Sequence, residues 1–218
     1  MNRLELRLAV REDLQDEKTP YLWSDASINR WINEAQSEAC RRSRLLVDST
    51  SPMCTLVFNA GEALLKLNPS ILFVKRAIVA SDSRQLGKAM VRDLDSERPG
   101  WEDETGSPSA WVPDFQAGQI RLDRIPEEET TVRLTVIRAP KPLADDDAEP
   151  EIPERYHENM LHWVRFRAYS KQDADTMSDE AANKALALFE MEFGKRSSAI
   201  EETWNSANYD FSEYQGAF

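Results

Sequence analysis

The stretch DASINRWINEAQSEACRRSRLL, residues 25–46, decides the fold, because it predicts a long amphipathic helix. Its apolar residues recur at helical spacing, and they are Ile28, Ile32, Ala35, Ala39 and Leu46, with Trp31 at the margin of the stripe. Ser24, directly before the stretch, is a residue type that commonly caps the N-terminus of a helix. A helix with one apolar stripe has to bury it against other elements, so the stretch predicts a helical layer.

Three further stretches predict helices, one before this helix and two near the end of the chain. Residues 3–16 form a short candidate, which is followed by a break at Thr19-Pro20. Residues 154–171 form the next, and the last one begins near Ser178, a natural N-cap. The apolar stripe of this last helix consists of Ala182, Leu186, Phe189 and Phe193. The simplest packing brings the two helix pairs together as an antiparallel bundle.

Between the helix pairs lies a stretch with the pattern of a β-rich module, residues 53–140. Its segments are short, rich in branched residues and bounded by turn residues such as Gly61 and Asn68-Pro69. The predicted strands are CTLVFNA (54–60), EALLKLN (62–68), ILFVKRAIV (71–79), SAWVPD (109–114), QIRLDRI (119–125) and TVRLTVIRA (131–139). Residues 88–97 predict one short helix. We therefore expect a sandwich-like or barrel-like module inserted into the helical bundle.

These patterns predict the α+β fold class and a division into domains. Residues 140–154, PKPLADDDAEPEIPE, are acidic and rich in proline, which is typical of an exposed linker. The predicted domains are a helical bundle (1–52 and 151–200), an inserted β-rich module (53–140), the linker proper (141–150) and an extended C-terminal arm (201–218).

The charge of the chain argues against tight binding of nucleic acid. The 218 residues carry a formal net charge of −12, whereas proteins that grip DNA usually present a basic patch. The dense basic cluster of Arg41, Arg42 and Arg44 ends the long helix, where a C-terminal cap explains it at least as well as phosphate contact. Hydrophobic residues make up 41% of the chain, so it can build a core and global disorder is not expected.

No pattern in the sequence predicts secretion or a membrane span. The opening residues, MNRLELRLAVRED, have charges every few positions and lack the apolar region of a signal peptide. No apolar run approaches the roughly 18 residues that a membrane span needs. Cys40 and Cys54 do not make a disulfide framework. We therefore expect a protein that is made in soluble form in the cytoplasm and has no membrane partner.

Both histidines of the chain lie in YHENMLHW, residues 156–163, which raises the question of a metal site. The two histidines of an H-E-x-x-H zinc helix are four residues apart, whereas His157 and His162 are five apart. This spacing turns the imidazoles about 140° from each other around the helix, so they cannot jointly hold one ion. No cluster nearby offers a third ligand. We interpret His157 as a packed, hydrogen-bonded histidine, and we expect no metal and no cofactor.

The motifs of common enzymes are absent from the sequence. It lacks the G-x-S-x-G elbow of hydrolases and the phosphate loop G-x-x-x-x-G-K-[ST]. The segment ETGSPSAW, residues 104–111, has serines but no neighbouring base, and it is typical of a turn before a strand. The run 145–147 contains three aspartates, but in a proline-rich linker such runs are usually solvated. We expect no catalytic residues. A metal-dependent hydrolase that uses the acidic linker and His157 is the poorest of three hypotheses.

The last residues, SAIEETWNSANYDFSEYQGAF (198–218), combine four acidic residues with five aromatic ones and contain no basic residue. The aromatic residues are Trp204, Tyr209, Phe211, Tyr214 and Phe218. This number is unusual for a disordered end. Either the stretch packs on the protein's own surface as a strand or arm, or it docks its aromatics into pockets of a partner and orders on binding. We favour docking, which makes these five residues the candidate binding site.

Three stretches resemble motifs of the head-to-tail adaptor proteins of tailed bacteriophages. WSDASINRWINEAQSEACRRSRLL (23–46) resembles the first long helix of these adaptors. PGWEDETGSPSAWVPD (99–114) resembles their W-x-x-x-x-G-x-P-x-x-[WY]-V segment in the β-module. PEIPERYHENMLHWVRFRAYSKQDADTMSDEAANKALALFEMEF (150–193) resembles their closing helix pair. Together the similarity covers most of residues 3–195.

The resemblance implies a structural protein of the virion neck and not an enzyme. Such adaptors form a homo-oligomeric ring, commonly of twelve copies, beneath the portal protein. They extend the DNA channel and provide the platform for a tail or nozzle protein. A C-terminal arm commonly attaches to the portal, so the resemblance implies a portal-binding role for the five aromatic residues. DNA is expected to pass without specific binding, because acidic channel walls would let it slide.

Two classes of function are open from the sequence. The first is this connector between portal and tail. The second is a transient phage assembly factor or chaperone, which holds portal or tail subunits in the cytoplasm and then leaves. Abundance in purified virions separates the two.

Overall fold

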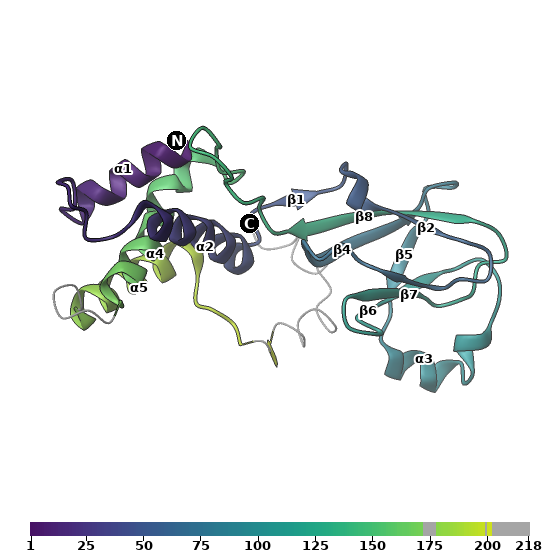
Figure 1. Ribbon diagram of the computed structural model, residues 1–218. Helices are drawn as coiled ribbons and strands as arrows, with labels where there is room; N and C mark the ends of the chain where they lie inside the picture. The colour runs from purple at the N-terminus through teal and green to yellow at the C-terminus, as the bar shows by residue number, and fades with distance from the viewer. Residues whose placement is uncertain (172–177, 199, 202–218) are drawn as a thin grey trace. The chain divides into compact units, whose positions relative to one another are not determined.

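The computed structural model describes residues 1–171, 178–198 and 200–201 (Figure 1). This part of the chain divides into two compact units. The first, the helical unit, contains Met1–Leu46 and Ala139–Arg196, and the second, the β unit, is built on Val47–Arg138. The predicted α+β class is confirmed, because the sheet lies in the β unit and the long helices lie in the helical unit.

The helical unit contains α1 (Arg3–Asp13), α2 (Asp25–Ser43), α4 (His157–Tyr169) and α5 (Asp179–Phe193). Helix α4 packs against the other three, and α1 also packs against α2. The predicted caps are present, because Ser24 Oγ accepts a hydrogen bond from the backbone N–H of Ser27 at 3.2 Å and Ser178 Oγ accepts one from Ala181. Helix α2 ends earlier than predicted, at a left-handed Arg44 with φ of 53°.

The core of the helical unit is built from the stripes that the sequence predicts. The fully buried residues include Ile28, Ile32, Ala35, Ala39 and Phe189. Trp31 is also buried, although its position predicted the margin of the stripe. Leu46 is only partly buried, because it lies beyond the end of α2.

The prediction that 140–154 is an exposed linker is wrong for its apolar residues. Leu143 and Ile152 are 4% and 2% exposed and belong to the core of the helical unit. The backbone of Leu143 is held by Asn33 of α2, whose Oδ1 accepts a hydrogen bond from the Leu143 N–H at 2.8 Å. The segment is therefore a packed part of the helical unit, and its composition alone did not reveal the two buried anchors.

The β unit contains one mixed sheet, which runs in the order β1-β8-β4-β5-β6-β7-β3, with β2 also paired to β8. All six predicted strands are confirmed, and they are β2 (Thr55–Phe58), β3 (Leu64–Lys66), β4 (Ile71–Val79), β6 (Ala110–Pro113), β7 (Gln119–Leu122) and β8 (Thr130–Arg138). The sequence did not predict β1 (Val47–Asp48) or β5 (Gln85–Lys88). The pair β5–β6 is parallel, and the other pairs of strands are antiparallel.

The sheet curls around one hydrophobic core, which has Phe58, Ile120, Leu122 and Val132 fully buried at its centre. A smaller cluster forms where α3 (Val91–Glu97) and the residue Trp101 pack together. No helix in the part of the chain that the structure describes is long and apolar enough to cross a membrane.

Candidate functional site

The predicted binding residues Trp204, Tyr209, Phe211, Tyr214 and Phe218 lie outside the described residues. Two other sites of the described chain combine functional groups with a defined geometry. One is an arginine row on α1 in the helical unit, and the other is an apolar pocket in the β unit.

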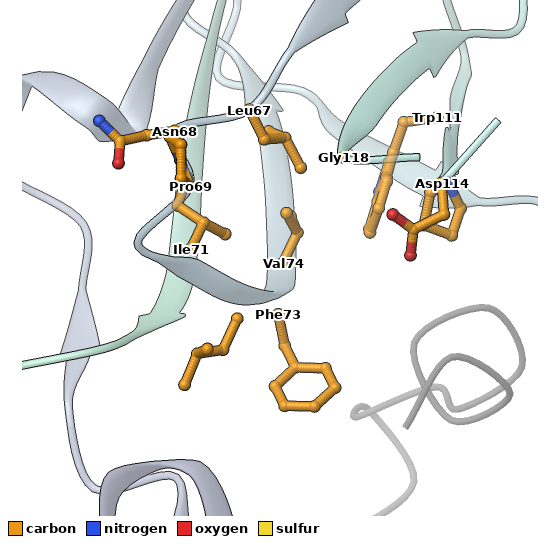
Figure 2. A pocket seen from close by; sticks show the side chains of 11 residues that line it. Leu67, Asn68, Pro69, Ile71, Phe73, Val74, Trp111, Asp114 and Gly118 are labelled. Carbon is orange, nitrogen blue, oxygen red and sulfur yellow. The ribbon is translucent and has the colours of Figure 1, made fainter. Parts of the chain in front are cut away.

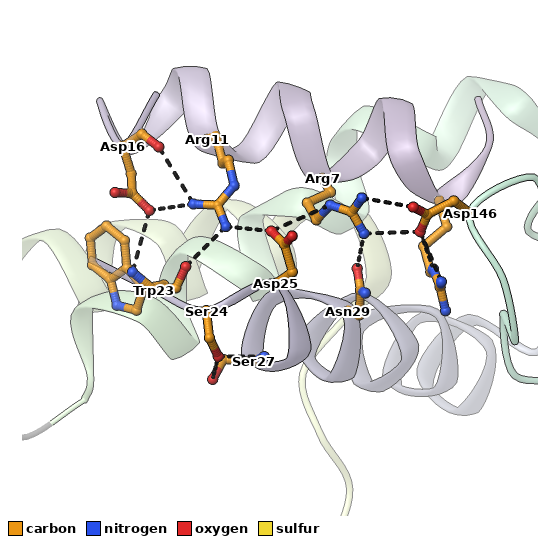
Figure 3. Close-up of polar contacts among 10 residues, drawn as sticks. Arg7, Arg11, Asp16, Trp23, Ser24, Asp25, Ser27, Asn29 and Asp146 are labelled. Carbon is orange, nitrogen blue, oxygen red and sulfur yellow. Dashed lines mark hydrogen bonds and ion pairs between the residues drawn. The ribbon is translucent and has the colours of Figure 1, made fainter. Parts of the chain in front are cut away.

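The arginine row consists of Arg3, Arg7 and Arg11, which follow each other at four-residue spacing on α1. This spacing places the three side chains along one side of the helix. Arg7 and Arg11 are 9% and 3% exposed, so the row faces inward (Figure 3). Buried charges cost free energy unless they are paired, and carboxylates meet each arginine of the row.

Arg11 lies at the centre of the deepest contact of this row. Its Nη1 donates to Asp16 Oδ2 at 2.5 Å, and its Nη2 donates to Asp25 Oδ1 at 2.6 Å and to the carbonyl of Trp23 at 3.0 Å (Figure 3). The guanidinium also stacks 3.7 Å from the ring centre of Tyr21. Asp16 lies in the connection between α1 and α2 and is only 6% exposed. The buried ion pair of Arg11 and Asp16 therefore fixes this connection against α1.

Asp146 pairs with the other two arginines and explains why the acidic segment packs on α1. Arg7 donates to both carboxylate oxygens at 2.9 Å, and Arg3 Nη2 donates to Oδ1 at 2.8 Å. Hydrogen bonds from Arg7 and then from Arg3 lower the pKa of Asp146 to about 2. Of the aspartate run, which was interpreted as solvated, Asp145 and Asp147 are exposed. The side chain of Asp146 is still 43% exposed, and the sequence did not reveal its pairing with Arg3 and Arg7.

We predict that Asp146→Asn destabilises the helical unit at neutral pH and that the difference shrinks in acid. The folded pKa of about 2 lies below the ordinary value of 3.8. The stabilisation is therefore complete above that ordinary value and is lost as the pH falls through the folded pKa. Thermal unfolding of the unmodified chain and of Asp146→Asn, at pH 7 and near pH 2, measures this loss of stabilisation. Asp145→Asn is the exposed control. A melting difference that is the same at both pH values would contradict the prediction.

The apolar pocket of the β unit has a volume of about 160 Å³. Side chains of β4, β6 and the turn before β4 line it, as Figure 2 shows. Its apolar lining includes Leu67, Pro69, Ile71, Phe73, Val74 and Trp111. A pocket of this size and lining can accept one apolar side chain of a partner, which is how interfaces anchor their central residues.

Irregular backbone shapes this pocket. The pairing of β4 with β8 shifts between Ile71 and Phe73 and again further along the strand, and such bulges re-aim side chains. On the other wall, the turn between β6 and β7 contains Asp114 with φ of 48° and Gly118 with φ of 69°. Glycine suits this left-handed conformation because it lacks a Cβ.

The segment 104–111 has a structural role, centred on a buried carboxylate. Asp123 is 0% exposed, and it accepts hydrogen bonds at 2.8 Å from the backbone N–H groups of Ser109 and Ala110 and from Ser109 Oγ. Arg98 Nη2 donates to it at 2.9 Å. Burial raises the pKa of Asp123, but these hydrogen bonds outweigh it and hold the pKa below its ordinary value. The serine at 109 thus contacts a carboxylate and no imidazole.

Both histidines lie on α4 and differ in burial, His157 being buried and His162 partly buried. His157 is 4% exposed, and its Nε2 lies 2.9 Å from the carbonyl oxygen of Ile152, so its interpretation as a packed, hydrogen-bonded residue is confirmed. Burial and then the charge of Arg165 lower the pKa of His162. Among the described residues, no group of three or more His, Cys, Asp and Glu side chains is placed to hold a metal ion.

Sequence reasoning did not identify the arginine row or the pocket. The signal for the row was present, because Arg3, Arg7 and Arg11 repeat every four residues. The pocket left no such signal, since the bulges that shape it are not encoded by a recognisable motif.

The comparison with protein families gives one match, and a search of curated proteins found none. The matching family model is described as SU10 adaptor protein, and it covers residues 1–210 of the chain. The resemblance to phage head-to-tail adaptors is thereby confirmed. The match spans both units, so the chain belongs to the SU10 adaptor protein family.

Proposed function

We propose that this phage adaptor is a structural protein of the virion neck, where it forms a ring beneath the portal. The ring, commonly of twelve copies in the proteins that the chain resembles, extends the DNA channel and carries the tail or nozzle protein. The match of residues 1–210 to the adaptor family is the observation that carries the proposal.

The net charge of the chain supports a channel that does not bind DNA tightly. A net charge of −12 disfavours the phosphate contacts that would hold DNA through counterion release. Several arginines of the helical unit are also engaged within the fold, because Arg3, Arg7 and Arg11 are paired with carboxylates. The proposed partners are therefore proteins, and DNA passes through the ring without specific binding.

We propose that the C-terminal arm attaches the ring to the portal through Trp204, Tyr209, Phe211, Tyr214 and Phe218. Aromatic side chains dominate the energetics of many interfaces because they bury a large area with few rotatable bonds. The arm contains four acidic residues and no basic residue. No enzymatic role is proposed for any residue of the chain.

Binding of purified portal protein tests this proposal. We expect the full chain to form rings on the portal, whereas a chain that ends at Ser198 loses binding by at least roughly a hundredfold, the effect of removing a few aromatic anchors. A matched control keeps the length and the acidic charge of the arm but replaces its five aromatic residues by serine. It should lose binding as the truncated chain does. Sedimentation and negative-stain microscopy measure both.

Each outcome of this experiment decides a different part of the proposal. If the truncated chain binds as well as the full chain, the arm is not the attachment and the body of the protein is. If neither chain binds, the connector role is wrong and the transient assembly factor takes its place. Purified virions give an independent check, because a connector is retained in them and an assembly factor is not.

A further inference from the structure

The exposed side of α1 carries two leucines among its acidic residues, where a surface helix is usually polar throughout. Leu4 and Leu8 are 38% and 56% exposed, and they lie one turn apart on the helix. On the inner face the same helix buries Arg7 and Arg11. Helix α1 therefore exposes these two leucines while it buries two arginines beside its core residues Leu6 and Val10, whereas a surface helix usually has its charged residues on the outside. We call Leu4, Leu8 and the exposed Glu12, which continues the row, the α1 stripe.

Single exposed leucines are ordinary, but a row of them beside further apolar side chains is typical of an interface. Tyr21 and Leu22 of the connection between α1 and α2 are 43% and 49% exposed. Tyr21 lies directly against α1, because Arg11 of that helix stacks on its ring. The apolar surface thus continues from α1 onto the next segment.

The same unit offers an open groove on another of its surfaces. The groove has a volume of about 390 Å³ and is lined by Arg30, Asn33, Glu34, Ser37 and Glu38 of α2 and by Trp163 of α4. The indole of Trp163 contributes an apolar wall. The aliphatic stems of the long charged side chains add to it, since their charged ends lie in water.

Charge favours an acidic helix as the occupant of this groove. Glu34 is shared by two arginines, with Arg30 Nε at 3.6 Å and Arg167 Nε at 3.1 Å. These three side chains together have one more positive than negative charge, and the other carboxylate of the lining, Glu38, is paired with Arg42 at 3.1 Å. The side chains of Arg30 and Arg167 are 64% and 40% exposed. The α1 stripe ends in an acidic residue, Glu12, so the stripe and the groove are complementary both in apolar character and in charge.

We infer that the α1 stripe of one copy of this chain packs into the α2 groove of the next copy. The two surfaces are different parts of one protein, so the contact is head-to-tail, and a head-to-tail contact closes into a ring when its rotation allows. The inference rests on the proposed function for the presence of a ring, and it assigns the residues through which neighbouring copies meet.

Disulfide trapping tests the contact directly. We would combine Leu8→Cys with Cys substitutions in the groove, at Arg30, Glu34 or Ser37, one in each variant. The native Cys40 and Cys54 are buried, and the chain with these two alone gives the background. Oxidation should give a ladder of covalent dimers, trimers and larger species. A matched control pairs each groove cysteine with Met191→Cys, an 80% exposed apolar position on α5, and should give no ladder.

For the variant at Ser37, no disulfide within one chain can compete with the links between copies. Arg7 contacts Asn29 and Arg11 contacts Asp25, so α1 and α2 run antiparallel and Leu8 lies beside the first half of α2. Ser37 is eight residues beyond Asn29, about 12 Å further along the axis. A disulfide needs Cα atoms within about 7 Å.

Charge reversal gives a second, independent readout. Leu8→Glu should weaken association between copies by roughly tenfold or more, because it removes the burial of a leucine. Glu12→Arg and Arg30→Glu should each weaken it, and the double variant should recover much of the loss. Met191→Glu should leave association unchanged. Circular dichroism is expected to show native helix content for all of these exposed positions.

The outcomes separate this contact from the connector role. The absence of a ladder for all three cysteine pairs, both in free protein at high concentration and in rings assembled on the portal, overturns the inference while the connector role stands. A ladder in protein that does not bind the portal supports the contact and overturns the connector role. Equal association of Leu8→Glu and the unmodified chain also overturns the inference.

Discussion

Arg11→Met should lower the free energy of unfolding of the helical unit by about 3–5 kcal/mol, the usual cost of breaking a buried ion pair from one side. Methionine keeps much of the side-chain volume but removes the charge. Asp16, which is 6% exposed, then loses its short contact with the guanidinium and keeps only the backbone N–H groups of Leu22 and Trp23. Its carboxylate is left buried without a counter-charge.

A double-mutant cycle identifies the stranded charge as the cause. Arg11→Met combined with Asp16→Asn should be clearly more stable than the sum of the two single changes predicts, because the residues form one contact. Arg30→Met, at an exposed arginine of α2, is the control and should change stability by less than about 1 kcal/mol.

The two units can unfold separately, so the measurement has to be local. Urea unfolding followed by hydrogen exchange in peptides from α1 and α2 reports the helical unit alone. Additive single changes would show that Arg11 acts through its contacts with Tyr21, Trp23 and Asp25 and not through Asp16.

Asp123→Ala should destabilise the β unit by about 3–5 kcal/mol, because it leaves several buried donors without an acceptor. The carboxylate accepts from two backbone N–H groups, one hydroxyl and Arg98. These groups belong to β6 and to the turns around it, so the substitution should also loosen the pairing of β6 with β7. Asp123→Asn keeps the shape and one acceptor oxygen, so its cost should be smaller.

The dependence on pH checks the same carboxylate in the unmodified chain. Its folded pKa lies below the ordinary value of 3.8. Its contribution is therefore complete above that value and is lost as the pH falls through the folded pKa. The stability difference between the unmodified chain and Asp123→Ala should shrink in acid. Hydrogen exchange of the Trp111 and Leu122 region measures this difference, with Glu129→Ala as an exposed control. If Asp123→Ala kept the native hydrogen-exchange protection in this region, the carboxylate would be dispensable for the β unit.

The sequence predicted the elements whose residues follow one clear period. The stripe of α2 and the six strands with branched residues belong to this group, since burial on one face imposes a period of 3.6 or 2. The strand β5 was missed because Gln85–Lys88 has one buried residue, Leu86, and a glycine. It forms because β4 and β6 lie on either side of it, which is information from distant parts of the chain.

The candidate sites were less predictable, because they depend on which charges are buried. A rule that places charged residues at the surface assigns Arg7 and Arg11 to solvent and leaves Leu8 for the core. The structure reverses this assignment, since Asp16, Asp25 and Asp146 compensate the guanidinium groups. Such compensation needs contacts as distant as residues 7 and 146, and no local pattern contains them. The stretch 140–154 was misjudged for the same reason.

The pairing of β1 with the end of β8 has a consequence for how the chain is made on the ribosome. Val47 pairs with Ile137 and Asp48 pairs with Val136, so the β unit closes where it begins. Synthesis runs from the N-terminus, and domains generally fold as they emerge. The β unit is complete once β8 has left the exit tunnel, whereas α1 and α2 still lack α4 and α5. The nascent protein thus carries α1 and α2 with an uncovered apolar stripe until α4 and α5 have been translated.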